Sequence, residues 1–245
     1  MRSNLCIVSG SSTERFTSYV NHRIYADLHG FDCRYDRGPI GHLPHSHFLK
    51  IEACQRVLPY YEWIFWVDDD AFFMQFDVNL LTFLNGAAKD TIFVACKSPI
   101  NLTGGWTHLS AGQWFLKNDP RSFELLESWK TCDRGVVAEW FDTSKYGLST
   151  GGDQDVLVYL LETDPRFKGL SELQPHTTFN NRPYHFNDSA HEHFLCHFAV
   201  NMPKDIAVRE FAARYGLDET LVADRYKPPY TPFFFDEEGR FNPKG

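Results

Sequence analysis

The chain has 245 residues, of which 43% are hydrophobic and 16% aromatic, and its formal net charge is −8. This composition can build one large domain with a substantial core, whereas the acidic balance argues against a nucleic-acid partner. No apolar stretch approaches the ~20 residues of a membrane span and no signal peptide is apparent, so we expect no transmembrane segment in this chain.

The N-terminal residues predict a strand, a tight turn and a helix. Leu5–Ser9 is a short apolar strand, Gly10 and Ser11 form the turn, and Ser11 with Glu14 fits a capping box. The helix is expected to end just before Gly30, which suits a left-handed C-terminal stop. Small residues at such a turn often contact a nucleotide or phosphate, although an ordinary turn between a strand and a helix explains them equally well.

The next segment predicts a second strand and a second helix. Phe31–Tyr35 predicts the strand, residues 36–44 are rich in Gly and Pro and predict a loop, and His45–Leu58 carries the apolar face of a helix. Lys50 lies on this helix and has the reach to bind a diphosphate. The ordinary alternative for Lys50 is a solvated surface side chain.

Three consecutive aspartates form the strongest signal in the chain. Trp63–Val67 is a run of bulky apolar residues, typical of a strand buried on both faces of a sheet, and Asp68, Asp69 and Asp70 follow at once. Side chains alternate along an extended segment, so Asp68 and Asp70 point the same way, at the strand end where open α/β sheets bind ligands. Such paired carboxylates suit Mg²⁺ or Mn²⁺ together with substrate phosphates. An acidic surface turn is the alternative.

Short elements follow in the middle of the chain. The sequence predicts a helix at 78–84, a strand at 91–96, a Gly-rich loop at 101–110, a strand at 110–117 and a helix from Pro120 with Asp119 as its N-cap.

Two glycines precede a second acidic stretch. Gly151 and Gly152 give the backbone freedom, and a helix then opens near Asp153. Asp153 and Gln154 are therefore candidates for contact with a bound polar ligand. Carboxylates at a helix N-terminus also serve simply as caps, and this alternative stays open.

Histidines are concentrated in the last third of the chain. His191, His193 and His197 share a face if the segment is a strand, whereas His193 and His197 are neighbours if it is a helix. The pattern is not HExxH, which excludes that metalloprotease motif. Further on, Ile206–Tyr226 predicts two short helices, and residues 227–245 predict an extended tail.

Five blocks together resemble a known family. They are Val8-Ser-Gly-Ser11, Leu28-His-Gly-Phe31, Trp63-Ile-Phe-Trp-Val-Asp-Asp-Asp70, Ser110-Ala-Gly-Gln-Trp-Phe-Leu116 and Gly152-Asp-Gln154, closed by His197-Phe198. Their order is similar to that in GT-A glycosyltransferases, most of all the galactosyltransferase GMA12/MNN10 type. The resemblance spans roughly residues 4–200. It implies an α/β fold with a Rossmann-like, mostly parallel sheet flanked by helices, a short helical C-terminal extension, a nucleotide-diphosphate sugar as donor and Mn²⁺ (or Mg²⁺) as cofactor.

The resemblance also implies roles for individual residues. The metal ligands would be Asp68, Asp70 and His197, and Asp153 and Gln154 would face the donor sugar and the acceptor. Nucleotide-sugar contacts would come from Ser9, Gly10, Ser11, Lys50, Asp69 and Gly112, and the sugar or acceptor pocket would include Gly151, Gly152 and Asp155. A catalytic domain at 1–203 and a C-terminal segment at 204–245 are expected.

This sequence departs from the family pattern in two blocks. Ser110 and Ala111 stand where Asn often precedes the glycine of the fourth block, and Gly152 stands where a second acid often precedes Asp-Gln. Family members usually carry a membrane anchor. We expect a cytoplasmic or otherwise soluble microbial or viral protein, or a Golgi-lumen enzyme if the chain is a trimmed form.

The leading hypothesis is a metal-dependent glycosyltransferase that moves a hexose or pentose to a glycan hydroxyl, with retention favoured by the resemblance. For inversion, Asp153 or Asp155 would act as the general base. One alternative is a nucleotidyltransferase, for which Arg15 near Gly10 is the only basic support. The other is a non-catalytic sugar- or zinc-binding module that uses the histidines of residues 191–197.

Overall fold

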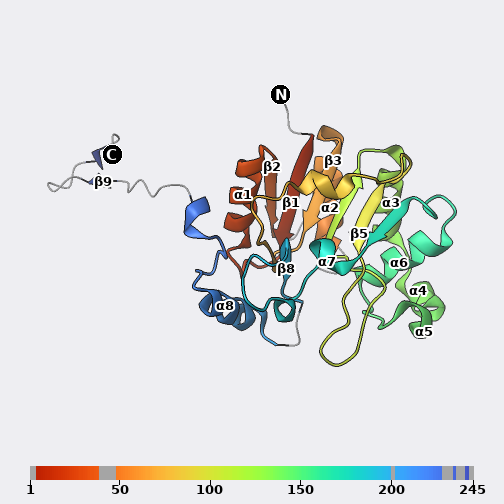
Figure 1. Ribbon diagram of the computed structural model, residues 1–245. Coiled ribbons are helices and arrows are strands. Elements are labelled where there is room, and N and C mark those ends of the chain that lie inside the picture. Colours follow the sequence, from red (N-terminus) through yellow and green to blue (C-terminus); the bar gives the residue numbers. More distant parts are fainter. Residues whose placement is uncertain (1–3, 39–47, 200–201, 228–233, 236–240, 243–245) are drawn as a thin grey trace.

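A six-stranded sheet forms the centre of the computed structural model, which describes residues 4–38, 48–199, 202–227, 234–235 and 241–242 (Figure 1). The strands are β1 (Leu5–Ser11), β2 (Asp32–Arg37), β3 (Trp63–Val67), β5 (Phe93–Cys96), β6 (Gln113–Lys117) and β7 (Ser171–Gln174), in the spatial order β2-β1-β3-β6-β5-β7. Only β6 runs antiparallel to its neighbours, so the sheet is mostly parallel, as predicted.

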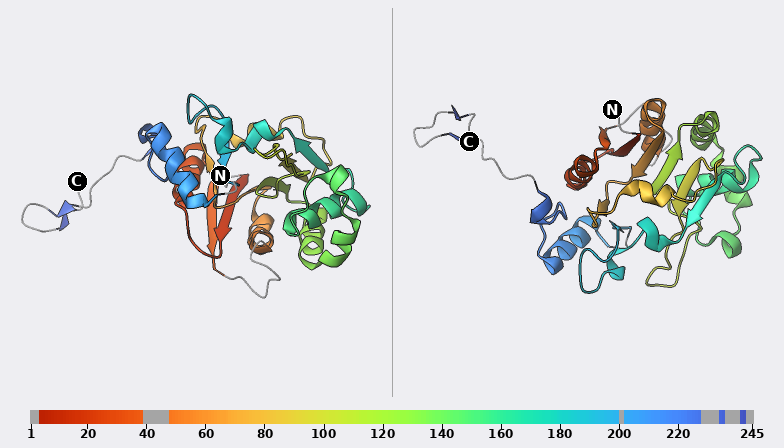
Figure 2. Two further views of the ribbon diagram at one scale, coloured as in Figure 1. Left: turned by 90° about the horizontal axis from the view of Figure 1, so that it is seen from below. Right: turned by 45° about the horizontal axis from the view of Figure 1, so that its top comes forward.

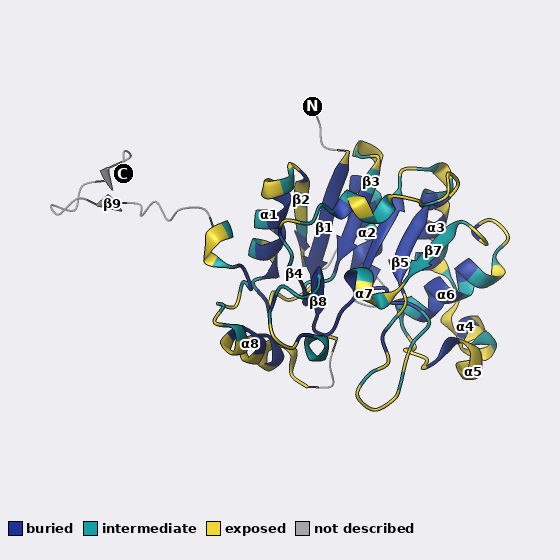
Figure 3. Cartoon of the chain, in the orientation of Figure 1, coloured by how far each residue is buried: buried dark blue, intermediate teal, exposed yellow. Residues whose placement is uncertain are grey.

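The central strands are buried because both faces of the sheet are covered (Figure 3). Every residue of β1 is buried, and so are the last four of β3. Alternate side chains enter opposite cores: Trp66 packs on the side of α2 (Leu49–Val57), α3 (Pro120–Thr131) and α6 (Asp153–Thr163), whereas Phe65 packs on the side of α1 (Ser18–His29). This is the pattern expected of strands that are apolar on both faces.

A small second sheet lies at the carboxyl end of β3. Its strands are β4 (Ala71–Phe73) and β8 (Leu195–His197), which pair antiparallel with Ala71 opposite His197. The pairing therefore brings His197 beside the aspartates that end β3. Helix α8 (Lys204–Tyr215) packs on this unit through Phe211, which contacts Phe198 edge-to-face.

The remaining elements lie around these two sheets. Within the described ranges they are α4 (Arg134–Trp140), α5 (Thr143–Tyr146), α7 (His176–Phe179) and the 3₁₀ turns Leu58–Tyr60, Leu80–Leu84, Pro183–His185 and Asp224–Tyr226. The short strands β9 (Phe234–Phe235) and β10 (Phe241–Asn242) are separate from these elements and pair only with each other. In both views of Figure 2, the blue helix α8 lies away from the green helices α4 and α5. Among the described residues, no helix has the length and apolar character to cross a bilayer.

Several predicted elements are confirmed. Strand β3 has the predicted bounds, Asp119 caps α3 by accepting the backbone N–H of Arg121, and Gly30 ends α1 with φ of 68°. Of the helix predicted at 45–58, residues 45–47 lie outside the described residues, Phe48 is the N-cap and Leu49–Val57 is helical.

Other predictions were wrong. Ser11 does not cap a helix, because it is the last residue of β1 and pairs with Arg37, and α1 begins only at Ser18. The predicted helix at 78–84 is a 3₁₀ turn, and the second C-terminal helix is likewise only a 3₁₀ turn at Asp224–Tyr226. The segment 191–197 is not helical, and only its last three residues form a strand. The tail predicted at 227–245 lies mostly outside the described residues.

Candidate active site

One large cavity of about 620 Å³ opens at the carboxyl ends of β1 and β3. The predicted site residues that line it are Gly10, Ser11, Lys50, Asp68, Asp69, Asp70, Gly112, Gly152, Asp153, Gln154 and His197. Three others are not among the lining residues: Ser9, Gly151 and Asp155. The fold therefore brings together side chains that are up to 187 residues apart in the sequence, from Gly10 to His197.

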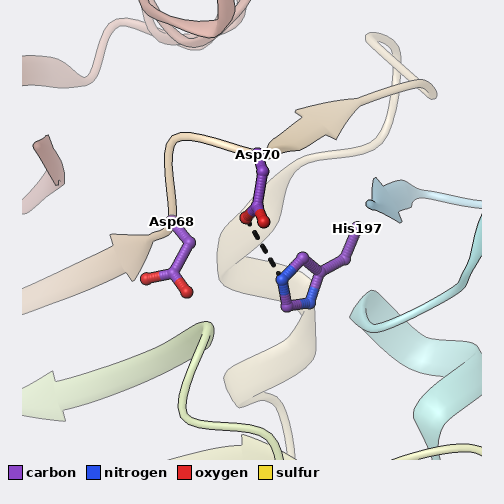
Figure 4. Close-up of side chains that lie close together, drawn as sticks. All are labelled: Asp68, Asp70 and His197. Carbon is purple, nitrogen blue, oxygen red and sulfur yellow. Dashed lines mark ion pairs between the residues drawn. The ribbon is translucent and has the colours of Figure 1, made fainter. Parts of the chain in front are cut away.

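Asp68, Asp70 and His197 form a group suited to a divalent cation (Figure 4). One ligand atom from each lies within 4.8 Å of the others, and His197 Nε2 is 3.2 Å from Asp70 Oδ1. The two aspartates occupy the turn between β3 and β4, and β8 supplies the histidine. Mn²⁺ accepts two carboxylates and one imidazole as ligands readily, whereas Mg²⁺ prefers the carboxylate oxygens.

Gly112 leaves the room that this group needs. A Cβ atom at position 112 would lie 2.5 Å from His197 Cε1 and 3.1 Å from Asp68 Oδ2. Any larger residue would therefore push the histidine or the aspartate away. The residues present fit a bound cation, both in their chemistry and in the space left for them.

Asp70 carries negative charge at the centre of the group. Burial alone favours the neutral acid, but His197 and the Lys204 ammonium outweigh it and hold the pKa of Asp70 far below its usual range. Lys204 Nζ contacts Asp70 Oδ2 directly. Lys204 is a site residue that the sequence analysis missed, because a lone lysine at the start of a helix resembles any solvated surface charge. The predicted division at 203/204 even assigns it to the C-terminal segment.

The His197 ring nitrogen that points away from Asp70 also has polar partners. Its Nδ1 lies 3.1 Å from Arg182 Nη1 and 3.3 Å from Asn180 Oδ1. Arg182 in turn donates to Asn180 Oδ1 at 2.6 Å, and all three side chains are buried. These contacts fix the plane of the imidazole, as partners behind a metal-ligating histidine commonly do. Neither Asn180 nor Arg182 was singled out from the sequence.

Lys50 connects the aspartate turn to the start of α6. Its Nζ lies 3.0 Å from Asp153 Oδ2 and 3.3 Å from Asp68 Oδ1, and it donates to the carbonyl oxygen of Ala111 at 2.9 Å. Burial disfavours the charged form, yet Asp153 and Asp68 outweigh it and raise the pKa of Lys50. The solvated alternative for Lys50 is therefore wrong, since three oxygens surround its ammonium in the interior.

Asp153 and Gln154 form the first turn of α6, with Gly152 as the N-cap. Gln154 Oε1 accepts the backbone N–H of Ala111 at 3.2 Å, and the Asp153 carbonyl oxygen accepts the indole N–H of Trp129 at 2.7 Å. These bonds fix the position of the helix start against β6 and α3. Both side chains line the cavity.

Asp155 lies behind the cavity wall and holds the turn that precedes α6. Its carboxylate accepts hydrogen bonds from Ser149 Oγ, from the backbone N–H and Oγ1 of Thr150 and from the N–H of Gly151, at 2.7–2.8 Å. Gly151 has φ of 64°, a conformation that favours glycine. The structure thus places Asp155 and Gly151 in the support of the site.

The end of β1 and the residues that follow it form another part of the wall. Gly10, Ser11, Ser12 and Arg15 line the cavity there. A Cβ at Gly10 would lie 2.5 Å from the carbonyl oxygen of Asp36 in β2, so the packing of two strands is sufficient to require this glycine. Asp69 also faces the cavity, and burial together with the adjacent Asp70 raises the pKa of Asp69 to about 6.

His191 and His193, the other histidines considered as ligands, do not join a metal group in the described part of the chain. His191 Nδ1 lies 2.6 Å from the carbonyl oxygen of Met74, and His193 Nε2 lies 3.2 Å from that of His185. Over the described ranges, the group of Asp68, Asp70 and His197 is the only one of its kind. A zinc site built from residues 191–197 has no support in this geometry.

Comparisons with known proteins agree with one another. The family model of the galactosyl transferase GMA12/MNN10 family matches residues 7–204. Galactomannan galactosyltransferase 1 of Cyamopsis tetragonoloba is 25% identical over 185 residues, which cover 66% of this chain and 42% of that protein. Glycosyltransferase 6 of Arabidopsis thaliana is 29% identical over 152 residues, which cover 56% of this chain and 34% of that protein. The chain therefore spans less than half the length of these relatives.

A solved structure supports the fold. It is a glycosyltransferase involved in the glycosylation of the major capsid of PBCV-1, with a TM-score of 0.55 and 13% sequence identity, and the match covers 85% of this chain and 98% of that one. At this identity the likeness concerns the fold alone.

Proposed function

The chain belongs to the galactosyl transferase GMA12/MNN10 family and has the GT-A fold, and from this premise we propose that it transfers a hexose or pentose from a nucleotide-diphosphate sugar to a glycan hydroxyl. The observation that carries the proposal is the convergence of Asp68, Asp70 and His197 on one cavity that also contains Asp153 and Gln154. Such a cavity can hold a diphosphate, a cation and a sugar together.

Asp68, Asp70 and His197 would hold Mn²⁺ or Mg²⁺. When bound, such an ion supplies Lewis-acid stabilisation of the charge that develops on a departing diphosphate. Gly10, Ser11 and the adjacent Arg15 offer the nucleotide a polar wall with one positive charge. The donor would thus extend from the end of β1 toward the start of α6.

Lys204 has a role that depends on what occupies the site. Its ammonium pairs with Asp70, and both side chains line the cavity. A cation bound to Asp70 would repel the ammonium, which would then need another anion nearby. A donor diphosphate is that anion, so we assign Lys204 to the phosphates.

Retention of configuration agrees better with the contacts around the two candidate bases. The Lys50 ammonium lies 3.0 Å from Asp153 Oδ2, which suits this carboxylate to steady positive charge on the sugar rather than to take a proton. Asp155 accepts four hydrogen bonds and is not among the residues that line the cavity. We therefore propose attack from the leaving-group face, with Asp153 and Gln154 beside the reacting carbon.

The cysteines support a reducing cellular compartment for this protein. All six cysteines of the chain are described in the structure as free thiols, and four of them are buried. Free thiols suit a reducing compartment such as the cytoplasm.

A screen of UDP- and GDP-sugars for nucleotide release tests the proposal. We expect at least one donor to be consumed with Mn²⁺ or Mg²⁺ and none in excess chelator, and Asp70→Asn to abolish release while the protein remains folded. Proton NMR of the product reads the anomeric configuration, for which retention is expected. Release that continues undiminished in chelator would rule out the metal role, and the absence of release from every donor would rule out the function.

A further inference from the structure

A protruding loop carries an unusual concentration of exposed apolar side chains. It connects β5 to β6 and is the long olive loop at the bottom of Figure 1. Ile100 is 65% exposed, Leu102 81% and Trp106 38%, and Leu148 beside the loop is 53% exposed. Trp106 and Leu148 also line the cavity that holds the candidate metal site. Exposed apolar patches next to a binding cavity commonly mark an interaction site.

Internal hydrogen bonds hold this loop in one conformation. Asn101 Oδ1 accepts the backbone N–H and the hydroxyl of Thr103 and the N–H of Gly105, at 2.8–3.0 Å. The Asn101 N–H also donates to the carbonyl oxygen of Gly105 at 2.7 Å. The loop is therefore pre-formed, which lowers the entropic cost of binding a ligand there.

Trp106 is fixed against the segment before α6. The N–H of Leu148 donates to the Trp106 carbonyl oxygen at 2.7 Å, and Thr107 pairs with Gly147. A Cβ at Gly147 would lie 2.3 Å from that carbonyl oxygen and 2.9 Å from Cδ2 of the indole. The glycine thus lets the indole lie close to the backbone, while more than a third of the tryptophan remains open to solvent.

The charged residues that line the cavity do not come from the loop. Four basic and four acidic residues line it: Arg15, Lys50, Arg182 and Lys204, and Asp68, Asp69, Asp70 and Asp153. The loop and Leu148 beside it contribute Ser98, Pro99, Asn101, Gly105, Trp106, Thr107 and Leu148 to the lining, and none of these is charged. The charged groups of the cavity thus lie outside the loop, and the loop residues suit a neutral ligand that has both apolar and hydroxyl-bearing surfaces.

We propose that residues 98–107 and Leu148, here called the acceptor platform, bind a neutral saccharide by stacking the apolar face of a pyranose ring on the indole of Trp106. This inference rests on the proposed function and deepens it, because it places the acceptor. The platform leads into the Thr150–Asp155 turn, so a saccharide on Trp106 directs its next unit toward Asp153. We infer a neutral glycan because none of the residues of the platform is charged.

The test measures binding of neutral tetra- to hexasaccharides of mannose, galactose, xylose and glucose to the full chain without donor, by saturation-transfer NMR and titration. We expect at least one series to bind the wild type and Trp106→Ala to weaken that binding by about tenfold or more, because aromatic stacking is lost. Trp106→Phe should retain most of the affinity. Leu148→Ala removes apolar contact without altering the indole, and it should weaken binding by about threefold.

Tyr60→Ala is the matched control, since Tyr60 is 66% exposed and lies outside the residues that line the cavity. This variant should bind the saccharides as the wild type does, and thermal unfolding of each variant checks its fold. Equal binding by wild type, Trp106→Ala and Leu148→Ala would overturn the platform, as would Trp106-dependent binding of phosphatidylcholine vesicles in place of any saccharide.

The two proposals fail in different ways. A wild type that consumes a nucleotide sugar but binds no member of the saccharide series would overturn the platform and leave the transferase function standing. A wild type that consumes no donor, yet binds a saccharide through Trp106, would overturn the transferase function and support the platform as a glycan site.

Discussion

At the scale of single residues, Lys204 and a metal ion compete for the same carboxylate. Lys204 Nζ contacts Asp70 Oδ2, whereas His197 Nε2 is 3.2 Å from Asp70 Oδ1. The Asp70 side chain is only 4% exposed, so its charge is compensated almost entirely by these neighbours. Removal of the ammonium therefore changes the affinity for a cation and the affinity for an anion in opposite directions.

We predict that Lys204→Met raises the affinity for Mn²⁺ alone and lowers the affinity for UDP or GDP measured with saturating Mn²⁺. The first effect follows because the ion no longer displaces an ammonium, and the second because a positive charge near the diphosphate is lost. Calorimetric titration measures both. Lys227→Met is the control, because Lys227 pairs with Asp218 and Asp224 outside the cavity. Parallel losses of both affinities would contradict the competition.

A second residue-scale prediction concerns the buried pair of Lys50 and Asp153. Their side chains are 8% and 10% exposed, and Nζ lies 3.0 Å from Oδ2. Lys50→Met leaves the charge of Asp153 without this ammonium, so we expect the free energy of unfolding to fall by about 3 kcal/mol. Asp153→Asn added to Lys50→Met should recover part of that loss.

A double-mutant cycle from urea unfolding tests the coupling of these two residues. The exposed pair of Lys145 and Glu162 provides the control, since its Nζ to Oε2 distance is 3.6 Å and pairs of that kind contribute about 0–1 kcal/mol. Additive effects of Lys50→Met and Asp153→Asn would show that the ion pair does not stabilise the site.

At the scale of elements, α1 anchors the strand that follows the aspartate turn. Asn21 Nδ2 donates to the carbonyl oxygen of Phe73 at 3.0 Å, and Asn21 Oδ1 accepts the N–H of Phe73 at 2.8 Å. The next residue of α1 adds a third hydrogen bond to β4, because His22 Nε2 lies 2.7 Å from the carbonyl oxygen of Ala71. A carbonyl oxygen only accepts, so His22 is the Nε2–H tautomer.

This link makes stability sensitive to acid. Burial lowers the pKa of His22 to about 4, against an unfolded value near 6.5. Between these values the unfolded chain binds more protons, so stability falls as pH drops from about 6.5 toward 4, by about 3 kcal/mol for a shift of this size. We predict that His22→Gln, which keeps a donor for Ala71 but does not titrate, flattens this part of the pH profile of unfolding. An unchanged slope in the variant would assign the acid sensitivity to other groups.

The elements also show what the sequence can and cannot predict. Strand β3 and the cap of α3 depend on local composition, and both were predicted with their positions. Strands β4 and β7 and helices α4 and α5 were not predicted. Strand β4 has only three residues, and its partner β8 lies more than 120 residues further along the chain, so no local pattern signals it. Strand β7 is only half-buried along its length and lacks a clear alternation.

Long-range contacts likewise determine the conformation and the contacts of several site residues. Ser11 had the local pattern of a helix cap, but pairing with β2 kept it in a strand. The outer aspartates and His197 were predicted as metal ligands, and the fold places them together, although the ion itself stays a prediction. Asn180 and Arg182 acquire their contacts with His197 only through the fold, so their sequence surroundings give no sign of them.

At the scale of the whole molecule, the cation and the nucleotide should stabilise the chain jointly. The ligand group joins the turn after β3 to β8, and the cavity wall adds the end of β1, so one complex connects three distant segments. We predict that Mn²⁺ with UDP or GDP raises the midpoint of thermal unfolding more than the sum of the two separate shifts. Ligand at a hundred times its Kd contributes about 2.7 kcal/mol, which corresponds to roughly 5–10 °C for a chain of this size. In Asp70→Asn the joint shift should disappear, because the diphosphate then lacks the ion that links it to the protein. A nucleotide shift of equal size in chelator would instead mean that the basic residues alone bind the phosphates.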